Sequence, residues 1–277
     1  MPMSVLTNKS ALTALQNLTA TNEKLNTVQS RLNTGLAVAN AKDNGATWAI
    51  AQKQRGDFSS LNAVKMSLDR ATSVADVAMS AGQQISDTLI AMREKVVGAA
   101  EGSATDSSRK AFNDEYRTLL SAIKQFSGAA RFDGIGLLDG TQTADLEFLA
   151  NAEGDSFIVL TPQDFTISGS TINLAGTSLT GTTSSVKDVL TQLDLAIAGV
   201  TSKLAELGAQ SKQIEKHVLF TSKLQDVLET GIGNLVDADI AKESARLQAL
   251  QVQQQLGTQA LSIANSQPQV ILKLFQG

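Results

Sequence analysis

The sequence contains no cysteine, so it cannot form disulfides, thiolate metal sites or a cysteine nucleophile. This absence leaves the cellular compartment open, because many extracellular proteins also lack disulfides. Prolines number only three, and aromatic residues make up 4% of the chain. So few helix-breaking and bulky residues favour long helices packed side by side over a compact enzyme.

Charge and histidine content exclude further classes. The net charge is −4 and the pI about 5.1, so no basic surface for phosphate backbones is expected, and we predict no nucleic-acid partner. His217 is the only histidine, which excludes the histidine pairs of most catalytic zinc sites; we interpret it as a helix-surface residue. The glycines at 134 and 136 lack the lysine of a phosphate loop and are expected in turns. We predict no enzyme activity, no cofactor and no metal site.

The chain also lacks long apolar runs. Its first residues, 1–9, show no basic segment followed by an apolar stretch, so no cleavable signal peptide is expected. Nothing elsewhere approaches the length of a membrane span, so we expect no membrane insertion.

Heptad spacing of apolar residues is the strongest pattern present. Between residues 11 and 32 one series contains Ala11, Leu18, Leu25 and Leu32, and a second contains Ala14, Thr21 and Val28. This predicts a helix packed along a partner helix, ended by Gly35. Two further helices are expected over residues 46–99 and 106–127. A long seam follows near the other end, formed by Leu193, Val200, Leu207, Ile214, Thr221, Leu228 and Leu235, interleaved with Ile197, Leu204, Ser211, Val218, Gln225 and Ile232.

The middle of the chain has a different character. Short β-branched or aromatic segments at 146–149, 157–160, 165–167 and 171–174 predict strands, with a tight hairpin at Gly169 and Ser170. A run rich in hydroxyl groups follows, either as a flexible connector or as a site of O-linked sugar. Its candidate residues are Thr177, Ser178, Thr180, Thr182, Thr183, Ser184 and Ser185.

The last predicted helix, residues 239–264, has two apolar stripes separated by glutamines. One stripe contains Ala245, Ala249, Val252, Leu256, Ala260 and Ile263, and the other contains Ile240, Leu247, Leu250 and Leu261. A single partner helix cannot cover both stripes, so this helix is expected to be completed by neighbouring subunits, or to lie buried in a large monomeric core. Asp237 and Asp239 are expected to cap its beginning.

These patterns predict a mainly α fold: long antiparallel helices from both chain ends form a coiled-coil rod with a small β-rich insertion. We expect a terminal helical domain at 1–45 and 236–277, a rod domain at 46–130 and 186–235, and the insertion at 131–185. The predicted assembly interface comprises Leu18, Leu25, Leu32, Leu228, Leu235, Leu247, Leu250, Val252, Leu256, Leu261 and Ile263.

Several motifs, in order, resemble the bacterial flagellin family. They are residues 31–36 (RLNTGL), 41–46 (AKDNGA), 49–51 (AIA), 132–138 (FDGIGLL), 237–239 (DAD), 256–257 (LG) and 264–270 (ANSQPQV). The resemblance implies a self-assembling filament subunit whose terminal helices form an inner tube and whose rod helices form an outer tube. Trp48 and the ending at residues 274–277 depart from the family pattern.

The resemblance also implies partners and a location. The chain would polymerise with itself, leave the cell through a flagellum-dedicated export apparatus with an export chaperone, and contact filament cap and hook-associated proteins in the extracellular flagellum. Two alternatives remain open at this stage: a hook–filament junction protein that shares the terminal helices, and a secreted coiled-coil adhesin or translocator.

Overall fold

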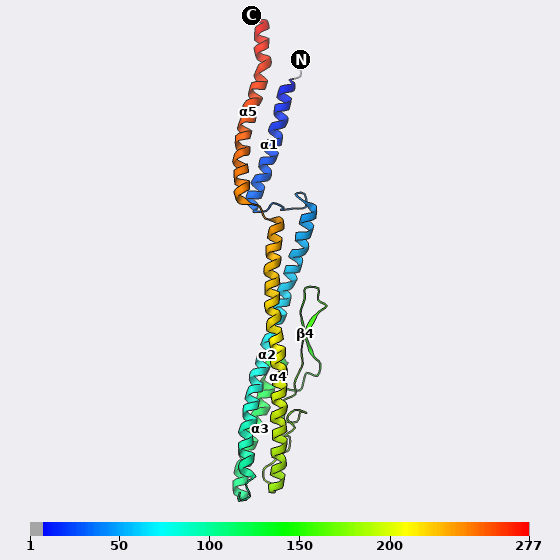
Figure 1. Cartoon of the computed structure of the whole chain (residues 1–277), viewed down its shortest axis with the longest axis vertical. Helices are drawn as coiled ribbons and strands as arrows, with labels where there is room; N and C mark the ends of the chain where they lie inside the picture. Colours follow the sequence, from blue (N-terminus) through cyan, green and yellow to red (C-terminus); the bar gives the residue numbers. More distant parts are fainter. Residues whose placement is uncertain (1–7, 277) are drawn as a thin grey trace. The chain divides into compact units, whose positions relative to one another are not determined.

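The computed structural model describes residues 8–276, with side chains up to Ser266. In this part of the chain the helices are α1 (Lys9–Thr34), α2 (Gly45–Ala99), α3 (Asp106–Ala129), α4 (Thr183–Val236) and α5 (Ile240–Gln276), and the strands are β1 (Arg131–Phe132), β2 (Ile135–Gly136), β3 (Leu146–Leu149) and β4 (Phe157–Leu160) (Figure 1). The predicted mainly α fold with a small β insertion is confirmed. The start of the chain at 1–7 lies outside the described residues, as do the side chains of the motif residues 267–270 and of the ending at 274–277.

Local capping explains where the helices begin and end. The side chain of Asn8 accepts a hydrogen bond from the backbone N–H of Ala11 at 3.0 Å, and Thr105 does the same for Ser108 at 3.2 Å at the start of α3. Gly35 ends α1 in the left-handed conformation with φ 72°, which glycine adopts without steric cost. Asp239 accepts from the backbone N–H of Lys242 at 3.1 Å, which confirms it as the cap of α5.

The chain divides into two compact units, Met1–Gly56 with Val227–Gly277 and Asp57–Asp226, and α2 and α4 contribute to both. In the first unit α1 and α5 lie side by side and antiparallel (Figure 1). A hydrophobic cluster of buried residues between them comprises Leu25, Val28 and Leu250, with Leu247 packed against it. The heptad pattern of α1 is confirmed, since every residue of its two series is buried or half-buried.

The second unit contains the larger apolar core. Leu68, Leu89 and Met92 of α2, together with Tyr116 and Ile123 of α3, are fully buried. The seam predicted on α4 is confirmed, because each of its residues is buried or half-buried, and Leu193, Val200, Leu207 and Ile214 are completely so. Across this unit Gln225 donates a hydrogen bond to Asn62 at 2.8 Å.

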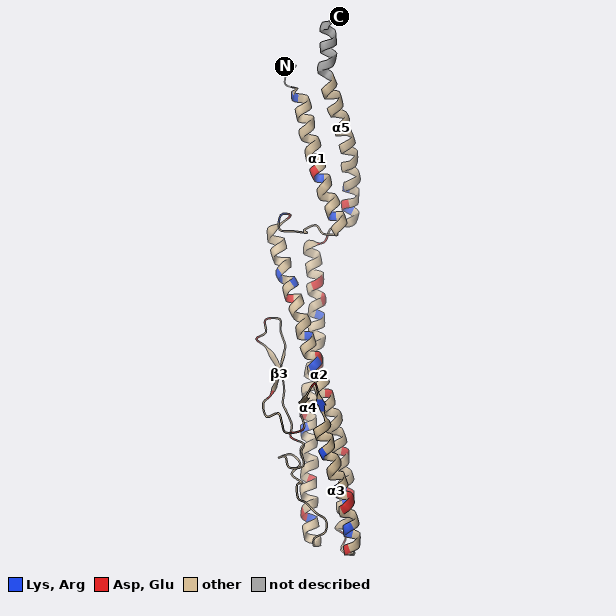
Figure 2. Ribbon diagram, turned by 180° about the vertical axis from the view of Figure 1, so that it is seen from behind, with Lys and Arg blue, Asp and Glu red and all other residues tan. Residues whose placement is uncertain are grey.

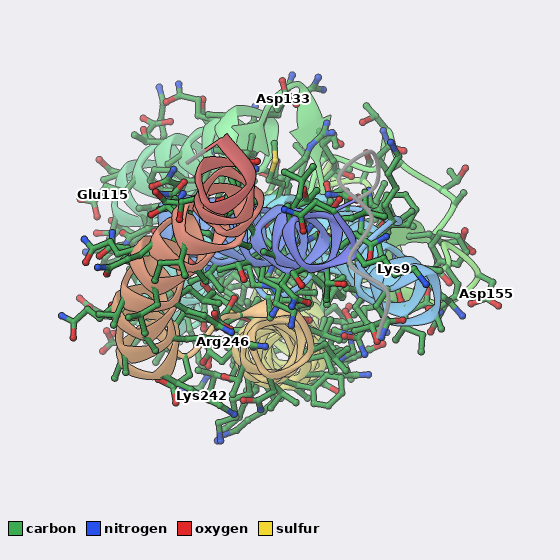
Figure 3. All side chains as sticks on the ribbon, turned by 90° about the horizontal axis from the view of Figure 1, so that it is seen from above. Lys9, Glu115, Asp133, Asp155, Lys242 and Arg246 are labelled. Carbon is green, nitrogen blue, oxygen red and sulfur yellow. The ribbon has the colours of Figure 1, made fainter. Side chains whose placement is uncertain are left out.

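The insertion also belongs to the second unit. Strands β3 and β4 form an antiparallel hairpin over the predicted residues, with Leu146 opposite Leu160 and Leu149 opposite Phe157. The turn that carries Asp155 joins them and projects away from the helices of this unit (Figure 3). On its inward side Leu149 N–H donates to Ser67 of α2 at 3.1 Å, and Thr161 N–H donates to Gln210 of α4 at 3.2 Å. The hairpin is therefore fastened to both long helices.

The prediction of strands at 165–167 and 171–174, and of a hairpin at Gly169 and Ser170, is wrong. This segment forms turns, in which Asp164 accepts hydrogen bonds from the backbone N–H and the hydroxyl of Thr166 at 2.9 and 2.7 Å. Phe165, Ile172 and Leu174 are buried as single anchors. Their apolar character serves side-chain packing, while backbone groups are satisfied by local turn bonds.

Of the glycines expected in turns, Gly134 has φ 78° in the β1–β2 turn, as predicted. Gly136 does not lie in a turn, contrary to prediction: it belongs to β2 and pairs with Arg131 of β1. Gly140 adopts φ 68° after this hairpin. Close by, Asp139 pairs with Arg131. Burial alone would raise the pKa of Asp139, but hydrogen bonds from Thr141 and the charge of Arg131 outweigh burial and lower it.

Candidate assembly surface

Helix α5 buries one of its two apolar stripes and exposes the other. Toward α1, Leu250 is buried and Leu247 and Leu261 are half-buried. Val252, Leu256 and Ile263 are 56%, 61% and 59% exposed. We name as the outer stripe the exposed residues Ala245, Ala249, Val252, Leu256, Ala260 and Ile263. Within one chain, α1 covers one face of α5 only.

Ile240 differs from its predicted place. The helical period puts it on the stripe of Leu247 and Leu250, but it is 46% exposed. It is the first residue of α5, beside the end of the antiparallel α1 at Thr34.

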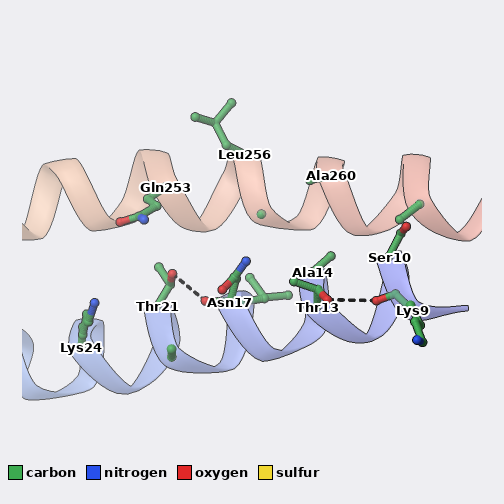
Figure 4. Close-up of a pocket in the computed structure, with 14 residues that line it drawn as sticks. Lys9, Ser10, Thr13, Ala14, Asn17, Thr21, Lys24, Gln253, Leu256 and Ala260 are labelled. Atoms are coloured by element: carbon green, nitrogen blue, oxygen red, sulfur yellow. Dashed lines mark hydrogen bonds between the residues drawn. The ribbon is translucent and has the colours of Figure 1, made fainter. Parts of the chain in front are cut away.

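A groove of about 890 Å³ lies between α1 and α5. Figure 4 shows its walls, with Ser10, Ala14 and Asn17 on α1 and Gln253 and Ala260 on α5, while Leu256 extends away from α1. Small side chains predominate in these walls. On α1, Leu12 and Leu15 are 59% and 48% exposed. The sequence prediction missed these two leucines because they lie outside the heptad series.

Charged residues are sparse on this surface. From Leu247 to Ser266 α5 carries none, and α1 carries none from Ser10 to Asn22, as the tan colour of both helices shows (Figure 2). Lys242, Glu243 and Arg246 are confined to the first turns of α5. The exposed part of the helix pair is therefore apolar or neutral, which is unusual for a surface that stays in water.

The two connections of the first unit are joined by backbone hydrogen bonds. The N–H groups of Ala37 and Val38 donate to the carbonyl oxygen of Val236 at 2.7 and 3.2 Å, and Ala238 N–H donates to Gly35 at 2.8 Å. Asp237 lies in this bridge, opposite Leu36. The segment that follows α1 and the segment that precedes α5 thus form one junction.

The predicted interface residues fall into two groups. Val252, Leu256 and Ile263 are exposed. The others are buried or half-buried within the chain: Leu18, Leu25, Leu32, Leu228, Leu235, Leu247, Leu250 and Leu261. The exposed group is available to a second copy, and the covered group orders the helices that present it.

The hydroxyl-rich run is less loop-like than predicted, since α4 begins at Thr183 and includes Ser184 and Ser185. Thr177 lies 2.6 Å from the hydroxyl of Tyr116, and burial raises the pKa of that phenol. Thr183 accepts from Arg109 at 2.8 Å. Ser178 contacts Asn113 at 3.1 Å, and Ser185 donates to Thr182 at 2.8 Å. Thr180, Thr182 and Ser184 remain exposed.

His217 is not a free surface residue, contrary to prediction. It is half-buried, and its Nε2 atom lies 2.6 Å from the carbonyl oxygen of Ala150. Within residues 8–276 no group of three or more histidine or acidic side chains could hold a metal ion. No helix in this same range is both long and apolar enough to cross a membrane.

The chain is similar to flagellins along nearly its whole length. The family description "Bacterial flagellin N-terminal helical region" matches residues 5–143, and "Bacterial flagellin C-terminal helical region" matches residues 190–275. Flagellin FljJ of Caulobacter vibrioides is 47% identical over all of both chains, and flagellin FljK of the same organism is 46% identical over 99% of this chain and 98% of its own. A flagellin of Brucella melitensis is 40% identical over 99% of both chains.

Solved structures agree with this result. A Bacillus cereus flagellin covers 56% of this chain and 87% of its own, with a TM-score of 0.50 and 26% identity. A putative flagellar hook-associated protein from Vibrio parahaemolyticus covers 70% of this chain and 100% of its own with a TM-score of 0.61, and at 14% identity it shows the shared fold alone. The chain therefore belongs to the bacterial flagellin family.

Proposed function

We propose that the outer stripe of α5, together with Leu12 and Leu15 of α1, forms the contact between neighbouring subunits of the filament. As a flagellin, the chain is a structural subunit of the extracellular bacterial flagellar filament. The observation that supports the contact is that α1 leaves a continuous, uncharged, apolar face of α5 exposed. Contiguous exposed apolar patches commonly mark sites of contact with another protein surface.

The exposed side chains of the outer stripe supply apolar area for this contact. Val252, Leu256 and Ile263 are already partly covered, so burying the remainder would contribute less than the roughly 1.5–3 kcal/mol of a fully exposed side chain. A contact that repeats from subunit to subunit without closing a ring produces a filament, whereas a closed contact would produce a small oligomer. The alanines of the outer stripe would let helices of adjacent subunits approach closely.

A charge substitution on the outer stripe tests this proposal. Leu256→Asp should stop filament growth, while the far-UV circular dichroism of the soluble chain stays unchanged, because Leu256 is already exposed in one subunit. Leu256→Met should polymerise as the parent does. Gln255→Asp places the same charge one residue away, on the polar flank, and should reduce sedimentable polymer less. Normal filaments from Leu256→Asp would contradict the proposal.

The domain arrangement, the partners and the absence of catalysis follow as parts of the same proposal. Residues 1–45 and 236–277 would form the inner tube, 46–130 and 186–235 the outer tube, and 131–185 an outer insertion. The subunit would be exported without a cleavable signal peptide, through the flagellar export apparatus and with a chaperone. It would also contact cap and hook-associated proteins. No enzymatic role is proposed. The hook–filament junction alternative has no observation in its favour, since the relatives at 46–47% identity are flagellins.

O-linked sugar on the hydroxyl-rich run is a separate proposal. The burial and hydrogen bonds of these residues reduce the number of candidate positions. Thr177 and Thr183 are half-buried, and their hydroxyl groups bond to Tyr116 and Arg109. Thr180, Thr182 and Ser184 are exposed, and the hydroxyls of the first two bond to Ser178 and Ser185 of the same run. Intact-mass and peptide mass spectrometry of filaments should find added sugar at those three positions first. Unmodified peptides throughout this run would contradict the proposal.

A further inference from the structure

Polar contacts occur at three levels along the seam between α1 and α5. Arg31 Nη1 lies 3.4 Å from Glu243 Oε1, and Gln254 donates to the side-chain oxygen of Asn22 at 2.8 Å. At the far end, Asn8 donates to the carbonyl oxygen of Ala264 at 2.7 Å. All three contacts connect residues of the same antiparallel pair, in one unit of the chain.

Apolar packing specifies the register of this seam only in part. One buried cluster contains Leu25, Val28 and Leu250, with Leu247 beside it. Elsewhere half-buried leucines at 18, 32 and 261 alternate with small or polar residues such as Ala11, Ala14, Thr21 and Ala264. Small side chains pack against one another in many relative positions, so helices that meet through them slide at low cost.

Sliding the helices by one heptad shows what the polar residues prevent. In the native register Leu25 and Val28 share a cluster with Leu250 and Leu247. Advancing α5 by seven residues brings Leu32 opposite Leu250 and Leu18 opposite Ala264. The same shift sets Gln254 against Gln29 and removes Arg31 from Glu243. It also breaks the backbone hydrogen bond between Ala238 and Gly35, so the ion pair and the junction both oppose the shifted register.

The Arg31–Glu243 pair is poorly explained by stability. The Glu243 side chain is 10% exposed, and both Arg31 Nε and Glu243 Oε2 are buried without a hydrogen-bond partner. Ion pairs that leave buried polar atoms unsatisfied are often no more stable than apolar replacements. Polar groups at core positions of coiled coils are best attested as determinants of register.

We propose that Arg31–Glu243 and Asn22–Gln254 are specificity-determining contacts that, together with the junction at Gly35 and Ala238, fix the register of α5 on α1. They thereby fix the position of the outer stripe relative to the exposed leucines of α1 in every subunit. The inference deepens the proposed assembly function, because subunits with different registers would present different surfaces to one another. It concerns the pairing of helices within one chain, and it is measured separately in soluble and in sedimented protein.

The absence of native cysteine allows a direct measurement by disulfide trapping. A Cβ atom placed on Gly257 would lie 3.9 Å from Leu18 Cβ, within the range of about 3.5–4.5 Å that disulfides require. Leu18→Cys with Gly257→Cys therefore reports the native register. Leu18→Cys with Ala264→Cys reports the register shifted by one heptad. Gel mobility separates intrachain loops from covalent dimers, and only the loops are counted.

The two reporters are compared in the parent and in an apolar variant, Asn22→Leu, Arg31→Met, Glu243→Leu and Gln254→Leu. We expect the ratio of native to shifted cross-link to fall about tenfold in the apolar variant, equivalent to about 1.4 kcal/mol. The charge-exchanged control, Arg31→Glu with Glu243→Arg, should keep the parental ratio because it restores the opposite charges.

An unchanged ratio in the apolar variant would overturn the proposal and assign the register to the Leu25–Val28–Leu250 cluster and the backbone junction at Gly35 and Ala238. A charge-exchanged control that loses register as fully as the apolar variant would overturn it too. Both soluble and sedimented fractions are measured, each against the parent in the same fraction. Failure of the parent itself to sediment would instead count against the proposed assembly function.

Discussion

His217 Nε2 lies 2.6 Å from the carbonyl oxygen of Ala150, a residue 67 positions earlier in the sequence. Because a carbonyl oxygen can only accept, Nε2 carries the proton in this contact. The ring of His217 also lies 5.7 Å from that of Phe220 on the same helix. The only histidine of the chain thus fastens the end of β3 to α4.

Removal of this contact should loosen the β3–β4 hairpin. His217→Ala deletes the donor and should reduce the free energy of unfolding by about 1 kcal/mol. Hydrogen exchange of amides from Leu146 to Leu160 should speed up more than exchange in α3. His217→Gln keeps a donor at similar reach and should recover most of the protection. Equal exchange in His217→Ala and the parent would show that the contact does not stabilise the hairpin.

A charge on the α4 seam should disrupt the helices that present the assembly surface. Leu228 is half-buried, whereas its neighbour Val227 is 66% exposed. Leu228→Asp should lower the helical content of the soluble chain and stop filament growth, because a carboxylate in a packed seam must lose water without a partner. Val227→Asp is the matched control for helical content. If both variants kept parental circular dichroism, the seam would not extend to Leu228.

Protease sensitivity should differ between free subunits and filaments. In a lone subunit only one face of α5 is covered. The apolar burial gained there offsets little of the conformational entropy lost when both terminal helices become ordered. Trypsin should therefore cleave soluble chains rapidly after Lys24, Arg31, Lys242 and Arg246, and should spare these sites in filaments. Lys65 and Arg70, in the second unit, serve as internal references. Equal protection of α1 and α5 in both forms would mean that one chain satisfies both apolar stripes.

Removal of α5 tests the same idea without a protease. Deletion from Asp239 to the end of the chain removes the outer stripe and the partner of α1, but leaves the second unit intact. The shortened chain should remain soluble and largely helical and should not polymerise. Loss of cooperative thermal unfolding in the shortened chain would show that α5 also stabilises the second unit.

Local patterns predicted much of the fold because local chemistry determines it. Sequence patterns placed α1, α2 and α3 within a few residues of their observed bounds. Gly35 was predicted to end α1 because a glycine acts on the backbone groups next to it, and it does so. The strands β3 and β4 were predicted at their observed residues. The strands predicted around Phe165 and Leu174 were wrong. Single buried apolar residues in a turn region give a segment the same composition as a short strand.

Contacts between residues far apart in the sequence could not be predicted from the helical periodicity. The two stripes of α5 were visible in the sequence, but nothing in the period of the helix states which stripe α1 covers. The partner of His217 comes from the insertion and leaves no periodic signal on α4. Leu12 and Leu15 were missed because an assembly face need not follow the heptads that build the subunit.

The stretch of α5 from Leu247 to Ser266, which lacks charged side chains, has a consequence for the environment in which the polymer persists. Contacts between charges weaken as ionic strength rises, over a Debye length of about 10 Å at 0.1 M salt. Burial of neutral side chains has no such dependence, and excluded salts such as sulfate strengthen it. A polymer held together by this stretch would keep its cohesion in both fresh and saline water.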